Sequence, residues 1–154
     1  MAMIRRLLCK PNRWISVVGS CLFVLLLSGC MASLVSDYDE NTDRAVTELH
    51  KEFETFFVTL KTQTDQPDCN YDNHKTFYIE SAVSVSSIEI RASAIDKNEK
   101  TVEQIGLLKQ SMNTLQQLHE LSCLSEGQIE SLQSSFNSMF TAILRLELAK
   151  KRGS

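Results

Sequence analysis

The sequence predicts an all-α fold, an up-down-up-down bundle of four helices. The chain of 154 residues contains only two prolines, Pro11 and Pro67, and five glycines, so it has few residues that end helices. Four stretches beyond residue 41 repeat apolar residues at steps of three and four, the period of an amphipathic helix. Because the links between them are short, antiparallel packing buries each apolar stripe most simply.

The first expected helix covers residues 42–64, and either Asn41 or Thr42 is a suitable N-cap for it. Its apolar stripe is Val46, Leu49, Phe53, Phe56 and Leu60, with Phe57 beside it. Residues 63–73 have the composition of a loop, with Pro67, Asp68, Asn70 and Asp72.

The second expected helix covers residues 75–96, where the pattern is ambiguous. Val83, Val85, Ile88 and Ile90 suggest a strand, whereas helical spacing relates Tyr78, Ala82, Val85, Ile88, Ala92 and Ile95. A helix is expected because about 20 residues without a turn far exceed an ordinary strand of about 5 or 6. The serines in this segment indicate either a close helix contact or a groove for a partner: Ser81, Ser84, Ser86 and Ser87. The nearby aromatic residues are expected in the core: Phe53, Phe56, Phe57, Phe77 and Tyr78.

The third helix is expected to run to about Ser122. Residues 101–104 have the spacing of a capping box at its start, and Asn98 is the alternative cap. The fourth follows Ser125 and has the clearest period in the chain: Ile129, Leu132, Phe136, Met139, Ile143 and Leu146. The bundle domain is therefore predicted to cover residues 42–149. Residues 150–154 are expected to form a basic tail, whose charges either meet anionic lipid headgroups or simply follow a helix C-terminus: Lys150, Lys151 and Arg152.

The start of the chain has the layout of an export signal. Its first 13 residues are basic and contain no acidic residue, and a mostly apolar stretch runs from Trp14 to Leu27. The sequence Leu27-Ser28-Gly29-Cys30 closes this stretch. These four residues resemble the lipobox of bacterial lipoproteins, and the helical remainder is similar to small helical lipoproteins of Gram-negative bacteria. The resemblance implies that residues 1–29 are removed and that Cys30 carries diacylglycerol and an N-acyl chain.

The mature chain is then expected to begin with a tether over residues 30–41. Met31 follows the cysteine, and in enteric-type lipoproteins the lack of Asp there implies the outer membrane, on its periplasmic face. The inner membrane and the cell surface remain alternatives. A further alternative is that nothing is cut and residues 14–35 span the bilayer, since about 20 apolar residues suffice.

The lipoprotein interpretation also reduces the number of cysteines that can pair. Cys9 and Cys21 leave with the signal and Cys30 is acylated, so Cys69 and Cys123 remain as an even pair in an oxidising compartment. In an up-down-up-down bundle the link after the first helix and the link after the third lie at the same end. We therefore expect a Cys69–Cys123 disulfide, for which chain-entropy models give about 4 kcal/mol.

A metal site is the alternative at the same end of the bundle. Cys69, His74, His119 and Cys123 supply two thiolates and two imidazoles, a set that can bind Zn²⁺ tetrahedrally. The spacing fits no standard zinc module, and the compartment oxidises thiols, so no metal is the main expectation. Apart from the lipid on Cys30, no cofactor is expected.

Composition and motifs narrow the function. All 19 acidic residues follow Cys30 whereas four of the 16 basic residues precede it, so the mature chain is acidic and nucleic acid is not an expected partner. No catalytic motif is present, and the chain is not expected to be an enzyme. The sequence predicts a lipid-anchored, non-catalytic binding or scaffold module for an envelope protein or polymer. The alternatives are a homo-oligomer through the heptads of the first and fourth helices, and a small metal-binding lipoprotein.

Overall fold

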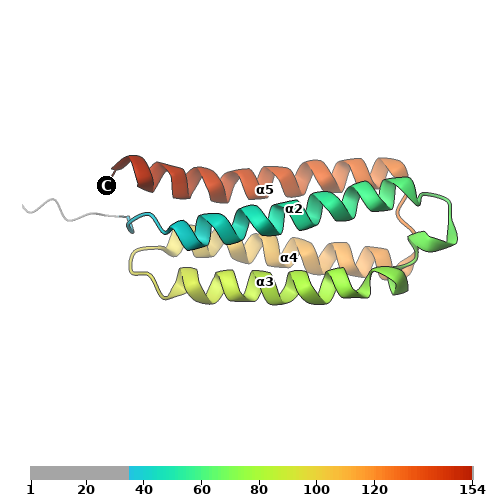
Figure 1. Cartoon of the computed structure of the whole chain (residues 1–154), viewed down its shortest axis with the longest axis horizontal. Helices are drawn as coiled ribbons and strands as arrows, with labels where there is room; N and C mark the ends of the chain where they lie inside the picture. Colours follow the sequence, from blue (N-terminus) through green and yellow to red (C-terminus); the bar gives the residue numbers. More distant parts are fainter. Residues whose placement is uncertain (1–34, 154) are drawn as a thin grey trace, which may run out of the picture. The chain divides into compact units, whose positions relative to one another are not determined.

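The computed structural model describes residues 35–153, and in this range the chain is an up-down-up-down four-helix bundle. The helices are α2 (Glu40–Thr62), α3 (Lys75–Ser93), α4 (Glu99–Leu121) and α5 (Glu126–Gly153). Two short 3₁₀ helices, η1 (Pro67–Cys69) and η2 (Tyr71–His74), form the link between α2 and α3 (Figure 1). The expected all-α fold is therefore confirmed. The expected signal peptide and the expected lipidation site Cys30 lie outside the described residues.

The helix boundaries differ from the expected ones by a few residues. Helix α2 begins earlier because Asp39, and not Asn41 or Thr42, is its N-cap: the Asp39 carboxylate accepts a hydrogen bond from the Thr42 backbone at 3.0 Å. The expected tether is also shorter, since Ser36 already bonds to the bundle through its amide, which donates to the Lys97 carbonyl at 3.0 Å. The ambiguous second segment is helical, and α3 ends at Ser93.

The core lies between the four apolar stripes, and α2 contributes its largest part. The α2 residues Val46, Leu49, Phe53, Phe57 and Leu60 are almost fully buried. Phe53 stacks on Phe136 of α5 with ring centroids 4.7 Å apart. The expected aromatic cluster is core, with Phe77 only partly buried at its edge. The bundle thus places α2 between α3 and α5, and it leaves one face of α3 on the outside.

Two turn residues have left-handed backbone conformations. Asp65 follows α2 with φ of 63°, and Lys97 precedes α4 with φ of 61°. Neither position is a glycine, although this region favours glycine. Side-chain bonds support the second turn, because the Asn98 amide donates to the Ala92 carbonyl at 2.9 Å. The link between α3 and α4 is therefore fixed at the same end of the bundle as the start of α2 (Figure 1).

Candidate binding surface

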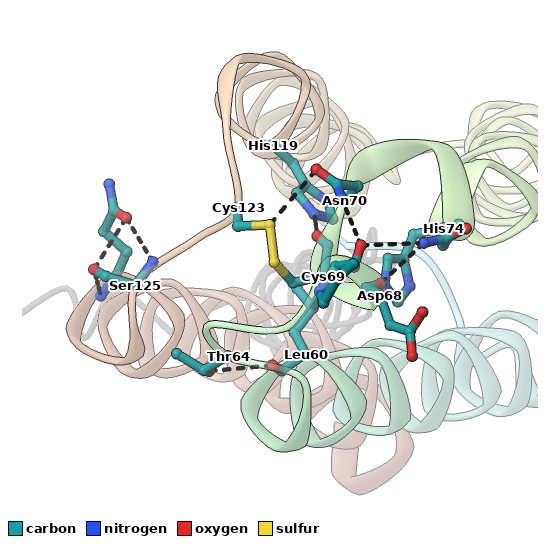
Figure 2. Close-up of a disulfide and its surroundings, with 12 residues drawn as sticks. Leu60, Thr64, Asp68, Cys69, Asn70, His74, His119, Cys123 and Ser125 are labelled. Carbon is teal, nitrogen blue, oxygen red and sulfur yellow. Dashed lines mark hydrogen bonds between the residues drawn. A yellow bond between two sulfur atoms is a disulfide. The ribbon is translucent and has the colours of Figure 1, made fainter.

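A disulfide between Cys69 and Cys123 closes one end of the bundle. Cys69 ends η1 and Cys123 follows α4, and their Cα atoms are 5.4 Å apart (Figure 2). The bond connects the α2–α3 link to the α4–α5 link, as the up-down-up-down topology predicted. It closes a loop with a sequence separation of 54 residues, so it removes much conformational freedom from the unfolded chain.

The two histidines lie beside this disulfide, with ring centroids 5.5 Å apart. His119 is almost fully buried, and its Nε2 donates to the Cys69 carbonyl oxygen at 2.6 Å. In the neutral ring, Nδ1 then accepts the Tyr78 hydroxyl proton across 2.8 Å. Burial raises the pKa of Tyr78 well above its usual range, which keeps this hydroxyl a donor. His74 bonds through Nε2 to the Asp68 carbonyl oxygen, and burial lowers its pKa.

The alternative zinc site requires sulfur and imidazole nitrogen atoms that are bonded to other groups in this structure. Both sulfur atoms belong to the disulfide, and both His119 nitrogens have hydrogen bonds. Within residues 35–153 no group of three or more histidine, cysteine, aspartate or glutamate side chains is arranged to hold a metal ion. The four residues come together as the sequence predicted, but as parts of a structural cluster.

A shallow groove runs along the seam between α2 and α3. At the end near the disulfide it is a depression of about 430 Å³ over the stacked rings of Phe56 and Phe77, whose centroids are 3.9 Å apart. Toward the other end it continues as a depression of about 440 Å³, and Glu52 lines both parts. The α3 wall contains three serines: Ser81, Ser84 and Ser87. Three of the four serines in the run therefore line a groove, and Ser86 does not. That the groove receives a partner stays a prediction.

Acidic residues line the middle of this groove. Glu48 and Glu52 project from α2 and Glu80 from α3, and all three are exposed. Partial burial raises the pKa of Glu52, and the neighbouring carboxylates of Glu80 and Glu48 raise it further. The groove thus holds mutually repelling negative charges, an arrangement that a bound cation relieves.

The outer face of α3 borders the groove and is apolar. Ile79, Val83 and Ile90 are 65%, 62% and 70% exposed, and they share one side of the helix because they are separated by four and seven residues. This stripe lies opposite the buried residues of the same helix, Tyr78, Val85 and Ala92. Apolar residues on both sides of α3 explain why the sequence showed strand-like alternation there. The exposed stripe was missed because the helical pattern was used only to find the core.

The seam between α2 and α5 offers a contrast. Its depression is larger, about 650 Å³, and small or polar residues of α5 line much of it, among them Ser134, Ser138 and Ala142. It has no excess of acidic side chains: Lys61 pairs with Glu130 at 2.6 Å, and Arg145 adds a further positive charge. No large exposed aliphatic residue lines it. Size therefore does not set the α2–α3 seam apart. It differs from the α2–α5 seam because an exposed apolar stripe borders it and because it has an excess of acidic side chains.

The opposite end of the bundle contains a buried ion pair. Residues 150–153 were expected to form a basic tail, but they continue α5, and Lys150 is 9% exposed. Its ammonium group donates to Glu147 and Asn98, each at 2.5 Å, and to Thr101 at 2.8 Å. Lys150 is therefore directed into the bundle, because its ammonium group shares this interior position with polar groups of α5, α4 and the α3–α4 link. Nearby, Arg91 forms a bidentate ion pair with Asp39 at 2.6 and 2.7 Å.

This geometry defines the chain as a small all-α bundle with one acidic, apolar-edged groove. No family model, curated protein or solved structure matches it. Among the helices that the structure describes, none is long and apolar enough to cross a membrane. The structure and the sequence motif at Cys30 are therefore the grounds for assigning a function.

Proposed function

We propose that this protein is a lipid-anchored envelope lipoprotein that acts as a non-catalytic binding or scaffold module. The observation that carries the binding role is the outer face of α3, where Ile79, Val83 and Ile90 are each more than 60% exposed. Exposed apolar residues gathered beside a groove are typical of an interaction surface, whereas scattered ones are ordinary. The disulfide and the continuous core support the role because they hold this surface rigid.

The lipobox sequence supports the anchor. Acylation of Cys30 with diacylglycerol and an N-acyl chain places several chains on one residue, which is enough for durable attachment to a bilayer. The outer membrane, on its periplasmic face, is the proposed location because Met31 follows the cysteine. The Cys69–Cys123 bond fits an oxidising compartment.

The alternative of a coiled-coil homo-oligomer has less support. The heptad residues of α2 and α5 that such an oligomer would use are already buried within the chain, among them Leu49, Phe53, Phe136 and Ile143. An oligomer through these seams would require the bundle to open. A binding role for α3 requires no such rearrangement.

The anchor is tested by intact-mass spectrometry of the protein extracted from its bacterial host. We expect a chain that begins at acylated Cys30 and is two hydrogens lighter than its reduced form. A chain that retains residues 1–29 would contradict the lipoprotein proposal.

The binding role is tested by site-specific photocrosslinking in living cells. A photoreactive residue replaces Ile79 or Ile90 on α3, and Thr141 on the α2–α5 seam serves as the matched control position. We expect a discrete crosslinked protein or polymer from the α3 positions and none from Thr141. Equal crosslinking from all three positions, or none from α3, would contradict the proposal.

A further inference from the structure

We propose that the α2–α3 groove binds an amphipathic helix of another protein, one with an apolar face and a flank of lysine or arginine residues. This inference rests on the proposed binding role and adds the class of partner. The groove, the aliphatic stripe and the acidic residues each match one part of such a helix.

The shape of the groove fits a helix. Ser84 and Ser87 on α3 and Ala45 on α2 are small, so the middle of the seam is shallow and open, whereas Phe77 and Arg91 lie toward its two ends. Small side chains allow the axis of a third helix to approach the two others closely. Ile79 and Ile90 are 11 residue steps apart, about 16 Å at 1.5 Å per residue, which corresponds to three helical turns.

The apolar face of the partner has a matching surface on α3. Val83 is exposed and also lines the groove, so the stripe and the groove form one continuous surface. At the other end of the groove, the partly buried Phe77 lies against Phe56. Helix-in-groove complexes depend on a few apolar anchors at such positions, spaced by three, four and seven residues.

The charge of the surface selects a basic partner. Glu48, Glu52 and Glu80 are acidic, and Arg91, at one end, already has its charge paired with Asp39. Lys51 lines the groove near Phe77, so the excess of negative charge lies in the middle and on the α2 side. Lysine or arginine residues on the partner's flank would face these carboxylates, which favours association and speeds the encounter.

A buried hydroxyl supplies a second indication of a ligand. Ser81 is fully buried, and its Oγ has no hydrogen-bond partner among residues 35–153, although such groups ordinarily have one. Ser81 lines the groove beside Glu80, and because its side chain has no exposed surface, a polar side chain of a bound helix would supply the missing bond after the Ser81 hydroxyl turns toward the groove.

A second copy of this chain fits the same surface poorly. Two copies joined face to face would place the carboxylates of each α2–α3 groove against those of the other, and Arg91 is not free to neutralise them. An acidic polymer meets the same repulsion. The charge therefore distinguishes a basic helix from these other occupants.

The experiment uses the mature, acylated protein in phosphatidylcholine nanodiscs. The probe is a fluorescent 14-residue leucine–lysine amphipathic peptide that carries one photoreactive residue, and a leucine–glutamate peptide with the same apolar face is its counterpart. Anisotropy is corrected with empty nanodiscs, and mass spectrometry identifies the crosslinked residues. We expect the lysine peptide to bind at least about tenfold more tightly than the glutamate peptide and to crosslink to α2 and α3.

Three variants sharpen the result. Glu52→Gln/Glu80→Gln should weaken the lysine peptide by about fivefold or more and reduce the salt dependence of its binding. Ile79→Ser/Ile90→Ser should abolish binding of both peptides, and helical circular dichroism checks that the exposed substitutions leave the fold intact. Glu130→Gln is the matched control, because it removes one acidic charge on the α2–α5 seam and should leave the affinity unchanged.

Several outcomes would overturn the inference. A basic helix is excluded as the occupant if the two peptides bind with equal affinity or if the crosslinks fall outside α2 and α3. It is also excluded if the mass of the protein doubles with concentration and Ile79→Ser/Ile90→Ser restores the mass of one chain. If α3 still crosslinks to a partner in cells, the class of partner is wrong and the binding role stands. If α3 captures nothing in cells either, the proposed function itself fails.

Discussion

At one end of the bundle a disulfide joins the two helix links, whereas at the other end the chain is held by ion pairs and hydrogen bonds. The first end has Cys69–Cys123 and the His119 cluster, and the second has the buried Lys150–Glu147 pair and the Asp39–Arg91 pair. Covalent closure depends on redox conditions and is insensitive to salt. The end held by ion pairs and hydrogen bonds depends on every partner being present, because a buried charge without its partner lowers the stability of the fold. The disulfide end should therefore lose stability under reducing conditions, and the polar end should lose stability when one partner of an ion pair is removed.

The largest expected effect is the loss of the buried cation. Lys150→Ala should lower the free energy of unfolding by about 3–5 kcal/mol, because it leaves Glu147 charged, buried and without a counter-ion. Urea unfolding followed by circular dichroism measures the change. The double variant Glu147→Leu/Lys150→Met removes both charges and should lose far less. Lys151→Ala, at the exposed neighbour whose ammonium group lies 4.9 Å from the centre of the Tyr38 ring, should cost less than about 1 kcal/mol.

Removal of the disulfide should have the next largest effect. Cys69→Ser/Cys123→Ser is expected to cost about 2–4 kcal/mol, mainly because the unfolded chain regains conformational freedom. The same unfolding curve with and without reductant measures it, since reductant should shift the wild type and leave the variant unchanged. Combined with Lys150→Ala, the two losses should add, because the sites lie at opposite ends of the bundle. Strong non-additivity would show that the ends are coupled.

A smaller effect is expected from the hydrogen bonds beside the disulfide. Tyr78→Phe leaves Nδ1 of the buried His119 without its donor, and it should cost about 1–2 kcal/mol. Tyr71→Phe is the control, because the Tyr71 hydroxyl is only partly buried and accepts from Gln116 near the surface. Thermal unfolding of the three proteins at pH 7 tests this, and equal melting temperatures for the Tyr78 variant and the wild type would contradict the role given to the cluster.

The smallest effect is a pH dependence at the polar end. Hydrogen bonding to Arg91 holds the pKa of Asp39 well below its usual range. The stability from this pair is therefore fully present above about pH 4 and is lost as the pH falls further through the lowered pKa. Asp39→Asn should cost about 1 kcal/mol at pH 7, and this difference from the wild type should shrink below pH 4. A difference that stays constant down to pH 2 would exclude the Asp39 charge as its cause.

The sequence was sufficient for the features that depend on periodicity. The apolar stripes predicted four helices, and the topology then predicted that Cys69 and Cys123 meet, because alternate links of an antiparallel bundle share an end. The predicted location of the aromatic residues was also right for the same reason. Boundaries were less certain, since the N-cap depends on whether Asp39 or a neighbour bonds the first turn.

The sequence was insufficient where a residue's environment depends on a neighbouring helix. Lys150 was expected in a basic tail because composition alone cannot reveal that Asn98, Thr101 and Glu147 surround it. The apolar stripe of α3 was hidden because Ile79 and Ile90 resemble core residues in a helical pattern. Only the placement of α2 and α4 on the other side of α3 identifies them as exposed.

The position of the disulfide also determines the covalent connectivity of the fold. The chain between Cys69 and Cys123 forms a closed ring that contains α3, the α3–α4 turn and α4. A protease that cuts the turn at residues 94–98 therefore opens the ring without separating the molecule. Two helical hairpins, α2–α3 and α4–α5, would remain joined through one sulfur–sulfur bond. The nicked protein would keep both walls of the groove on one fragment, and only a reducing agent would release the other.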